Sequence, residues 1–172
     1  MQLCPRHECK LVTTNGSEHR LALARVKISA LIYAPPRLFF VDTPFAVAVD
    51  YGCAYTLEVD GRGRSVLHVT TGWVALEAEG GKSFVPAGAA CVTEKGSAPA
   101  TPHRADASAR FIGALAEFDF SDNAKTRADA LHVVLDEANR KRDALTLWHL
   151  LARVEGGDFR SVLINLFHRP PV

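Results

Sequence analysis

Apolar and polar residues alternate in short runs along the first hundred positions of the chain. The runs lie at 21–26, 28–33, 38–42, 45–49, 55–59, 67–69, 73–79 and 89–93. Residues typical of turns separate them, among them Pro35-Pro36 and the segments 60–63 and 79–82. Short strands at this spacing, punctuated by turns, predict an antiparallel β-sandwich or roll.

The run at 45–49 shows the alternation most clearly. Phe45, Val47 and Val49 share one face of an extended strand, and Ala46 and Ala48 share the other. Because both faces are apolar, the strand is expected to be covered on both sides. We therefore predict a central strand, with its larger side chains directed into the core.

The period of the apolar residues changes beyond a small, polar, proline-containing connector at 94–102. Phe111, Leu115 and Phe118 fall at i, i+4 and i+7, which places them on one face of a helix. Three further stripes have helical spacing: Leu131, Val134, Leu135 and Ala138; Leu145, Trp148, Leu151 and Val154; and Val162, Leu163, Leu166 and Phe167. The pattern predicts a bundle of about three to four short helices.

The change of period divides the chain into two parts. Residues 1–103 are predicted to form the β domain, with an irregular segment at 1–18, and residues 104–172 a helical segment that packs on it. Gly156-Gly157 is expected to end the third helix, and Pro170-Pro171 the fourth.

Composition and charge narrow the class of protein. The chain has 172 residues, 48% of them hydrophobic and 23% charged, as is usual for a soluble globular protein. Its net charge of +1 lacks the basic excess of a nucleic-acid-binding protein, so no nucleic-acid partner is expected. No apolar run is long enough to span a bilayer, and the N-terminus lacks the apolar core of a secretory signal. The chain is therefore either cytoplasmic or a soluble fragment of an exported protein.

The N-terminal segment contains residues that loosely resemble zinc ligands. Cys4, His7, Cys9 and His19 lie close together in sequence. Their spacing is not that of a paired C-x2-C site, and no second cluster follows. The interpretation that fits this spacing is an irregular loop with incidental cysteines and histidines.

The predicted strands carry little that points to catalysis. His68 is the only histidine between His19 and His103, too few for the histidine set of a metal-binding cupin. Cys53 and Cys91 lie in apolar strand contexts typical of small buried residues, and a disulfide between them is left open. We therefore predict no catalytic residue, no metal site and no cofactor.

Six short elements follow one another in a fixed order between residues 41 and 92. They are Thr43-Pro44, 46–49, 51–55, 67–69, 72–76 and 86–88. In order and spacing they resemble the FecR-like family, periplasmic domains of regulators that partner extracytoplasmic sigma factors. The resemblance covers about a third of the chain. It implies a non-enzymatic sensory or protein-binding module outside the cytoplasm, tethered in its full-length form and partnered by a membrane-linked regulator or a transporter's signalling region.

The residues of this pattern also have a structural interpretation of their own. Thr43-Pro44 is expected to hold an extended approach to the next strand. Gly52 and Gly72 permit bends or close approaches that a Cβ would block, and Gly88 suits a turn position with φ > 0. These are folding requirements, and none of them is a chemical site.

Four large aromatic residues are the candidates for recognition of a partner: Tyr51, Tyr55, Trp73 and Trp148. Aromatic side chains with a polar tip dominate binding hot spots, although packing in the core or at its rim is the commoner role. Two other classes of function stay open. One is a cupin-like or barrel protein that binds a small ligand, and the other is a structural envelope or assembly protein that uses exposed sheet edges.

Overall fold

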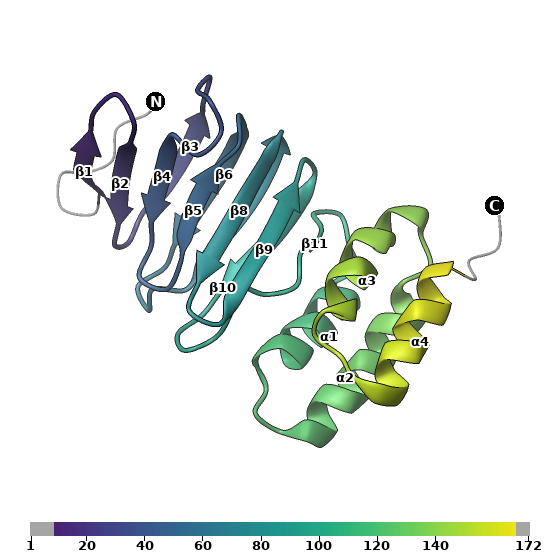
Figure 1. Cartoon of the computed structure of the whole chain (residues 1–172). Helices are drawn as coiled ribbons and strands as arrows, with labels where there is room; N and C mark the ends of the chain where they lie inside the picture. Colours follow the sequence, from purple (N-terminus) through teal and green to yellow (C-terminus); the bar gives the residue numbers. More distant parts are fainter. Residues whose placement is uncertain (1–8, 168–172) are drawn as a thin grey trace. The chain divides into compact units, whose positions relative to one another are not determined.

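The computed structural model describes residues 9–167, and the chain divides between Ala100 and Thr101 into two compact units. The first unit consists of β-strands and the second mainly of α-helices (Figure 1). The predicted fold class, a β-sandwich followed by about three to four short helices, is confirmed.

Between residues 9 and 100 the β unit contains ten strands in two sheets. The strands are β1 (Cys9–Thr14), β2 (His19–Leu23), β3 (Lys27–Leu31), β4 (Phe39–Asp42), β5 (Val47–Asp50), β6 (Ala54–Val59), β7 (Ser65–Thr71), β8 (Trp73–Ala78), β9 (Gly81–Pro86) and β10 (Ala89–Thr93). One sheet has the order β1-β2-β4-β5-β8-β9, and the other runs β10-β7-β6-β3 within this unit (Figure 1).

The pairing departs from the expected pattern at two places. All pairs within the unit are antiparallel except β2 and β4, which run parallel because the chain crosses to the other sheet through β3 between them. The prediction of an irregular segment at 1–18 is wrong for Cys9–Thr14, which form β1. This edge strand has a register shift between Leu11 and Thr13, and a bulge of this kind interrupts the alternation that a sequence pattern needs.

Apolar side chains fill the space between the two sheets. Leu57, Leu67 and Val69 of one sheet and Leu76 and Val85 of the other are between 0% and 2% exposed. Close packing of such side chains is the main source of stability in a sandwich of this kind.

The central strand β5 is covered on both faces, as predicted, but its two faces are exchanged. Register pairs Ala48 with Leu76, so this small residue faces the interior. Val49 pairs with Ala75 and therefore points to the opposite face, where it is nevertheless completely buried. The prediction that Val47 and Val49 face the core is wrong, because period two shows which residues share a face and not which face is inside.

A close approach of two glycines joins the β5–β6 connection to the turn between β7 and β8. Gly72 has φ +71°, and a Cβ built on it would lie 2.2 Å from the carbonyl oxygen of Gly52. Gly52 itself has φ +80°. Only glycine combines this backbone conformation with this approach, so the two positions hold the ends of four strands together.

The second unit begins with the short strand β11 (His103–Arg104) and continues as α1 (Ala109–Phe120), α2 (Ala124–Glu137), the 3-10 helix η1 (Lys141–Asp143), α3 (Ala144–Leu151) and α4 (Gly156–Phe167). Ser108 and Asn123 cap α1 and α2, each accepting a backbone N–H at 3.0 Å. The helices share a core of thirteen buried residues: Phe111, Ala114, Leu115, Phe118, Ala130, Leu131, Val134, Leu135, Ala138, Leu147, Leu150, Val154 and Val162.

Helix α3 presents a different face to this core from the one its spacing predicts. Leu147 and Leu150 are fully buried, whereas Trp148 is 67% exposed. The Thr146 hydroxyl donates to the Pro102 carbonyl at 2.9 Å, and this bond fixes the rotation of the helix. The predicted stripe through Leu145 and Trp148 is therefore wrong.

The predicted helix ends also differ from the structure. Helix α3 ends at Leu151, and Gly156 begins α4 instead of ending α3. Pro170-Pro171 lies outside the described residues. Within residues 9–167 none of the helices has the length and apolar character needed to cross a membrane.

The Gly52–Gly72 contact leads to a test with a matched control. Gly96 has φ +73°, nearly the same as Gly72, but open space where its Cβ would lie. We expect Gly96→Ala to lower the free energy of unfolding by about 1 kcal/mol, the cost of the left-handed conformation. Gly72→Ala should cost at least about 3 kcal/mol, because the Gly52 carbonyl must also move.

Urea denaturation in a Trp148→Phe background measures the difference, because Trp73 is then the only tryptophan and its fluorescence follows the β unit. Equal losses for the two alanine variants would contradict the close approach.

Candidate functional site

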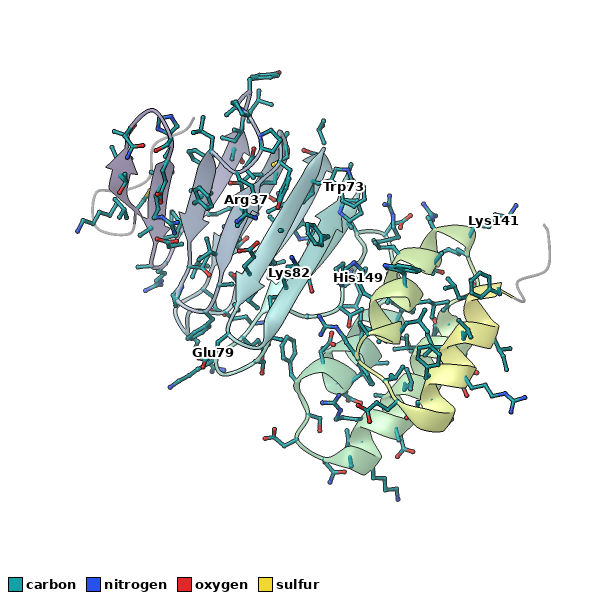
Figure 2. All side chains as sticks on the ribbon, viewed as in Figure 1. Arg37, Trp73, Glu79, Lys82, Lys141 and His149 are labelled. Atoms are coloured by element: carbon teal, nitrogen blue, oxygen red, sulfur yellow. The ribbon has the colours of Figure 1, made fainter. Side chains whose placement is uncertain are left out.

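The outward side of the six-stranded sheet gathers the chain's most distinctive polar and aromatic side chains. We call this surface the Arg37 face, defined by Arg37, Tyr51, Trp73, Glu77, Lys82 and Phe84. Figure 2 shows Arg37, Trp73 and Lys82 on this side of the sheet. Register places the strand residues side by side, with Ala75 opposite Phe84 and Glu77 opposite Lys82.

The base of the Arg37 face is apolar and fully covered. Val49 of β5 and Ala75 of β8 are paired and point outward, yet both are 0% exposed. Larger side chains must therefore lie over them. Tyr51 and Phe84 meet edge to face, with ring centroids 6.1 Å apart. The surface is thus a packed layer with defined side-chain positions, which favours binding over mere solvation.

A tight turn carries Arg37 to this face. Leu38 donates its N–H to the Pro35 carbonyl at 3.3 Å, and Arg37 has φ +63°, the conformation that the third residue of a type II turn requires. Arg37 is the only residue other than glycine with positive φ among residues 9–167. Its own N–H donates to the Asp50 carbonyl at 2.8 Å, which anchors the turn to β5.

The Arg37 side chain extends across the sheet from this turn. One guanidinium nitrogen, Nη1, donates to the Tyr51 hydroxyl at 2.9 Å and lies 3.3 Å from the Glu77 carboxylate. Both interactions raise the pKa of the Arg37 guanidinium, and the hydrogen bond to Tyr51 has the larger effect. The Arg37 guanidinium is therefore charged at any physiological pH, and its side chain is 52% exposed.

Two of the four predicted recognition residues meet at this face. Tyr51 donates its backbone N–H to the Trp73 carbonyl at 3.2 Å, and Trp73 exposes 52% of its surface. At the other end of the face, the Lys82 ammonium lies 5.3 Å from the centre of the Phe84 ring. Arg, Tyr and Trp therefore stand together with a second cation nearby.

The other two predicted recognition residues lie elsewhere. Tyr55 is 2% exposed, so the prediction that it contacts a partner is wrong. The pKa of the Tyr55 hydroxyl is raised, mainly by burial and to a smaller extent by the nearby Cys53 and Asp50. This hydroxyl has no hydrogen-bond partner in the described part of the chain. Trp148 is exposed on α3 of the helical unit, and its role in recognition stays a prediction.

The residues of the sequence pattern occupy turns. Thr43-Pro44 lies in the turn between β4 and β5, where the Thr43 hydroxyl accepts the Ala46 N–H at 3.1 Å, rather than in an extended approach. Gly52 and Gly72 form the close approach described above. Gly88, with φ +73°, lies in the turn between β9 and β10 and donates to the Val69 carbonyl at 2.7 Å.

The buried thiols are held in environments that suppress reactivity. Cys53 and Cys91 are both buried, and neither forms a disulfide within residues 9–167. The Cys53 thiol donates a hydrogen bond to the buried Asp50 carboxylate. The pKa of the thiol is raised, mainly because the group is buried and secondly because of this interaction with Asp50. No group of three metal-ligating side chains occurs within residues 9–167. Of the four N-terminal residues weighed as zinc ligands, Cys4 and His7 lie outside the described residues.

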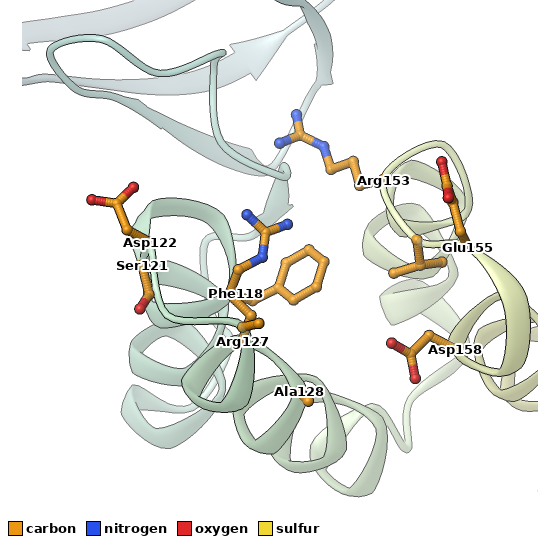
Figure 3. A pocket seen from close by; sticks show the side chains of 10 residues that line it. Phe118, Ser121, Asp122, Arg127, Ala128, Arg153, Glu155 and Asp158 are labelled. Atoms are coloured by element: carbon orange, nitrogen blue, oxygen red, sulfur yellow. The ribbon is translucent and has the colours of Figure 1, made fainter.

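The helical unit has a groove of its own, with a volume of about 510 Å³ (Figure 3). The Arg127 guanidinium lies 5.0 Å from the centre of the Phe118 ring, and Arg153 pairs with the buried Asp119 carboxylate at 3.1 Å. Burial raises the pKa of Asp119, while Arg153 opposes that shift. Three carboxylates line the groove as well, those of Asp122, Glu155 and Asp158. The groove is therefore lined by side chains of both charges.

Comparisons with known proteins add a distant likeness in fold. No model of a known protein family matches the sequence, and no curated protein matches it either. Two crystal structures of a "putative anti-sigma factor" from Parabacteroides distasonis are similar, each at 12% sequence identity. They cover 63% and 61% of this chain, with TM-scores of 0.48 and 0.47. This chain spans about half their length, 51% and 49%.

Sequence reasoning missed Arg37, Glu77, Lys82 and Phe84 as members of the face. One signal was present: Pro35-Pro36 is followed by arginine at the turn position that usually holds glycine or asparagine. The contact between this turn and β8 could not be predicted from the sequence, because the chain forms β6 and β7 of the other sheet between these two segments.

The strained turn predicts an unusual order of stabilities. Arg37→Gly and Arg37→Ala both remove the bonds to Tyr51 and Glu77, but only glycine adopts positive φ without cost. We expect the glycine variant to be more stable than the alanine variant by about 1 kcal/mol in urea denaturation. An alanine variant at least as stable as the glycine variant would argue against a left-handed Arg37.

The raised pKa of the Cys53 thiol predicts resistance to alkylation. At neutral pH, Cys53 should react with iodoacetamide at least about a hundredfold more slowly in the native protein than in urea-unfolded protein. Peptide mass spectrometry separates it from the other cysteines. Rapid native labelling of Cys53 would show that the Asp50–Cys53 pair is accessible.

Proposed function

We propose that this chain is a non-enzymatic sensory module that binds a protein partner through the Arg37 face, as part of regulation linked to sigma factors. The observation that carries the proposal is the packed layer in which Arg37, Tyr51 and Trp73 stand together on a sandwich whose interior is filled.

The chemistry of the face suits recognition of a protein. Arg, Tyr and Trp are the residue types that contribute most to binding hot spots, and they do so best on a preorganised surface. The Arg37 guanidinium donates to the Tyr51 hydroxyl at 2.9 Å, and the Tyr51 N–H donates to the Trp73 carbonyl, so that the backbone holds these two aromatic residues side by side. A partner that supplies carbonyl or carboxylate acceptors and an apolar side chain would complement Arg37, Lys82 and the exposed Trp73.

The strain at Arg37 supports the same site. A non-glycine residue with positive φ costs about 1 to 2 kcal/mol, and such strain is concentrated at functional positions. Glycine would form the turn at lower cost but would leave no charged group over the sheet. The strained turn therefore serves to place the Arg37 guanidinium over the sheet.

The interior of the sandwich supports a role without catalysis. A cupin-like or barrel protein that binds a small ligand needs a cavity between its sheets. Here Leu57, Val69 and Val74 fill that space at 0% to 2% exposure. The pKa of the buried Cys53 thiol is raised, which disfavours its use as a nucleophile at neutral pH.

The FecR-like pattern at 41–92 supplies the regulatory context of the proposal. Tyr51 and Trp73 both belong to that pattern, so the resemblance and the face overlap in the same segment. We infer that the module works outside the cytoplasm, tethered in its full-length form, and that its partner is a membrane-linked regulator or a transporter's signalling region. An upstream reading frame that encodes an export signal or a membrane span would support this placement.

Photo-crosslinking in the native host tests the proposed function. A benzophenone amino acid replaces Trp73, and a second variant carries it at Thr70, an exposed control position in β7 of the other sheet. We expect position 73 to capture a regulator or transporter component, and position 70 to give no such adduct.

The affinity of the captured partner then identifies the residues responsible. Trp73→Ala and Arg37→Ala should each weaken binding at least tenfold, about 1.4 kcal/mol or more. Lys95→Ala, at an exposed position outside the face, should leave the affinity unchanged. Equal crosslinking at positions 70 and 73, or a partner insensitive to both face variants, would refute the proposal.

A further inference from the structure

Within residues 9–167, strand β3 lies at an edge of its sheet with no further strand beside it. It is the last strand in the order β10-β7-β6-β3, and its inner side pairs with β6 from Lys27 opposite Glu58 to Leu31 opposite Ala54. An open edge is a ready template for another strand, and proteins usually blunt it or use it.

The hydrogen bonds of β3 show which of its residues face the open side. Val26 and Val59 exchange both backbone bonds, at 3.1 and 2.8 Å, and Ile32 donates to the Cys53 carbonyl at 2.9 Å. Antiparallel pairs alternate between bonded and non-bonded residues, so Ile28 and Ala30 are also bonded inward. The N–H and C=O groups of Lys27, Ser29 and Leu31 therefore point outward from the sheet edge.

The side chains of the same three residues are exposed. Lys27, Ser29 and Leu31 lie on the solvent face of the sheet, and Leu31 is 63% exposed. Tyr33, two residues beyond the strand, is 92% exposed. Binding by strand addition uses this combination, in which outward backbone N–H and C=O groups lie beside exposed apolar side chains.

We propose that β3 is the homodimer interface of this protein, pairing antiparallel with β3 of a second copy. Only one register pairs all three outward residues, and it sets Ser29 against Ser29 of the second copy on the two-fold axis. Each Lys27 then stands opposite Leu31 of the other copy. The pairing forms about six backbone hydrogen bonds and joins the two sheets edge to edge.

The charges of β3 fit this register. Because Lys27 lies opposite Leu31 of the second copy, the pairing brings no two lysines together, and the Lys27 stem can cover the exposed leucine. Glu58 of β6 already balances Lys27, with the two charged atoms 3.0 Å apart. An extension of the same register brings Tyr33 toward the exposed Arg25 of the second copy, a suitable cation–π pair.

Three substitutions test the interface in the full chain, with sedimentation velocity from about 1 to 500 μM as the measurement. Ser29→Pro removes an outward N–H and leaves the bonds between β3 and β6 in place, so the dimer dissociation constant should rise at least about tenfold. Ser29→Thr keeps that N–H and should dimerise like the unchanged protein.

The charge pair gives a test of register that does not depend on proline. Leu31→Lys opposes Lys27 of the second copy and should raise the dissociation constant at least about tenfold, whereas Leu31→Glu should leave it within about threefold of the original. Both variants lose the same apolar surface. A monomer at every concentration, a dimer insensitive to Ser29→Pro, or equal effects of lysine and glutamate at position 31 would overturn the proposal.

Dimerisation through β3 can be tested independently of partner binding at the Arg37 face. Arg37→Ala and Trp73→Ala lie on the other sheet and should leave the dimerisation constant unchanged. Ser29→Pro should likewise leave partner binding at the Arg37 face intact. A variant that disturbs both readouts would point to loss of the β unit's fold, which far-ultraviolet circular dichroism detects.

Discussion

The contact between the Gly52 carbonyl and Gly72 constrains the whole β unit. It brings the end of β5 against the turn between β7 and β8, and so connects strands from both sheets at one point. The backbone bond from Tyr51 to Trp73 lies directly beside it, and the bond from Arg37 to the Asp50 carbonyl lies one residue further along β5. A side chain at position 72 would separate these segments. The arrangement of the Arg37 face is therefore a consequence of how the sandwich closes.

The same closure supports the proposal that this unit binds a partner on its surface. Apolar side chains occupy the space between the two sheets. On the outward side of the six-stranded sheet, Val49 and Ala75 form a covered base and an arginine is held in a strained turn. The two surfaces used in the proposals differ in kind. The Arg37 face offers side chains, whereas the β3 edge offers backbone groups.

The sequence was sufficient for the class of fold and for most strands, because alternation with a period of two survives wherever one face is buried. It failed where the physical signal is absent. The bulge in Cys9–Thr14 breaks the alternation of β1, and the small Ala48 lies inside while Val49 lies outside. In α3, the bond from Thr146 to Pro102 sets the helix rotation, and spacing alone cannot reveal that.

Prediction of the site was limited in the same way, because a local sequence pattern does not show which residues meet in the folded chain. Tyr51 and Trp73 could be chosen by residue type, but Tyr55 matches them in type and is part of the core. Arg37 became visible only when the crossing of the chain between sheets was known, since the strand it joins is distant in sequence. Local pattern thus identifies residues able to bind, and the topology decides which of them meet.

Residue-resolved amide exchange of the unchanged protein tests the closure most directly. The account predicts strong protection of the Tyr51 and Arg37 amides, although both lie in connections outside the strands, because they donate to the Trp73 and Asp50 carbonyls. Exchange of these two amides at the rate of an unstructured peptide, while the β5 and β8 amides stay protected, would contradict it.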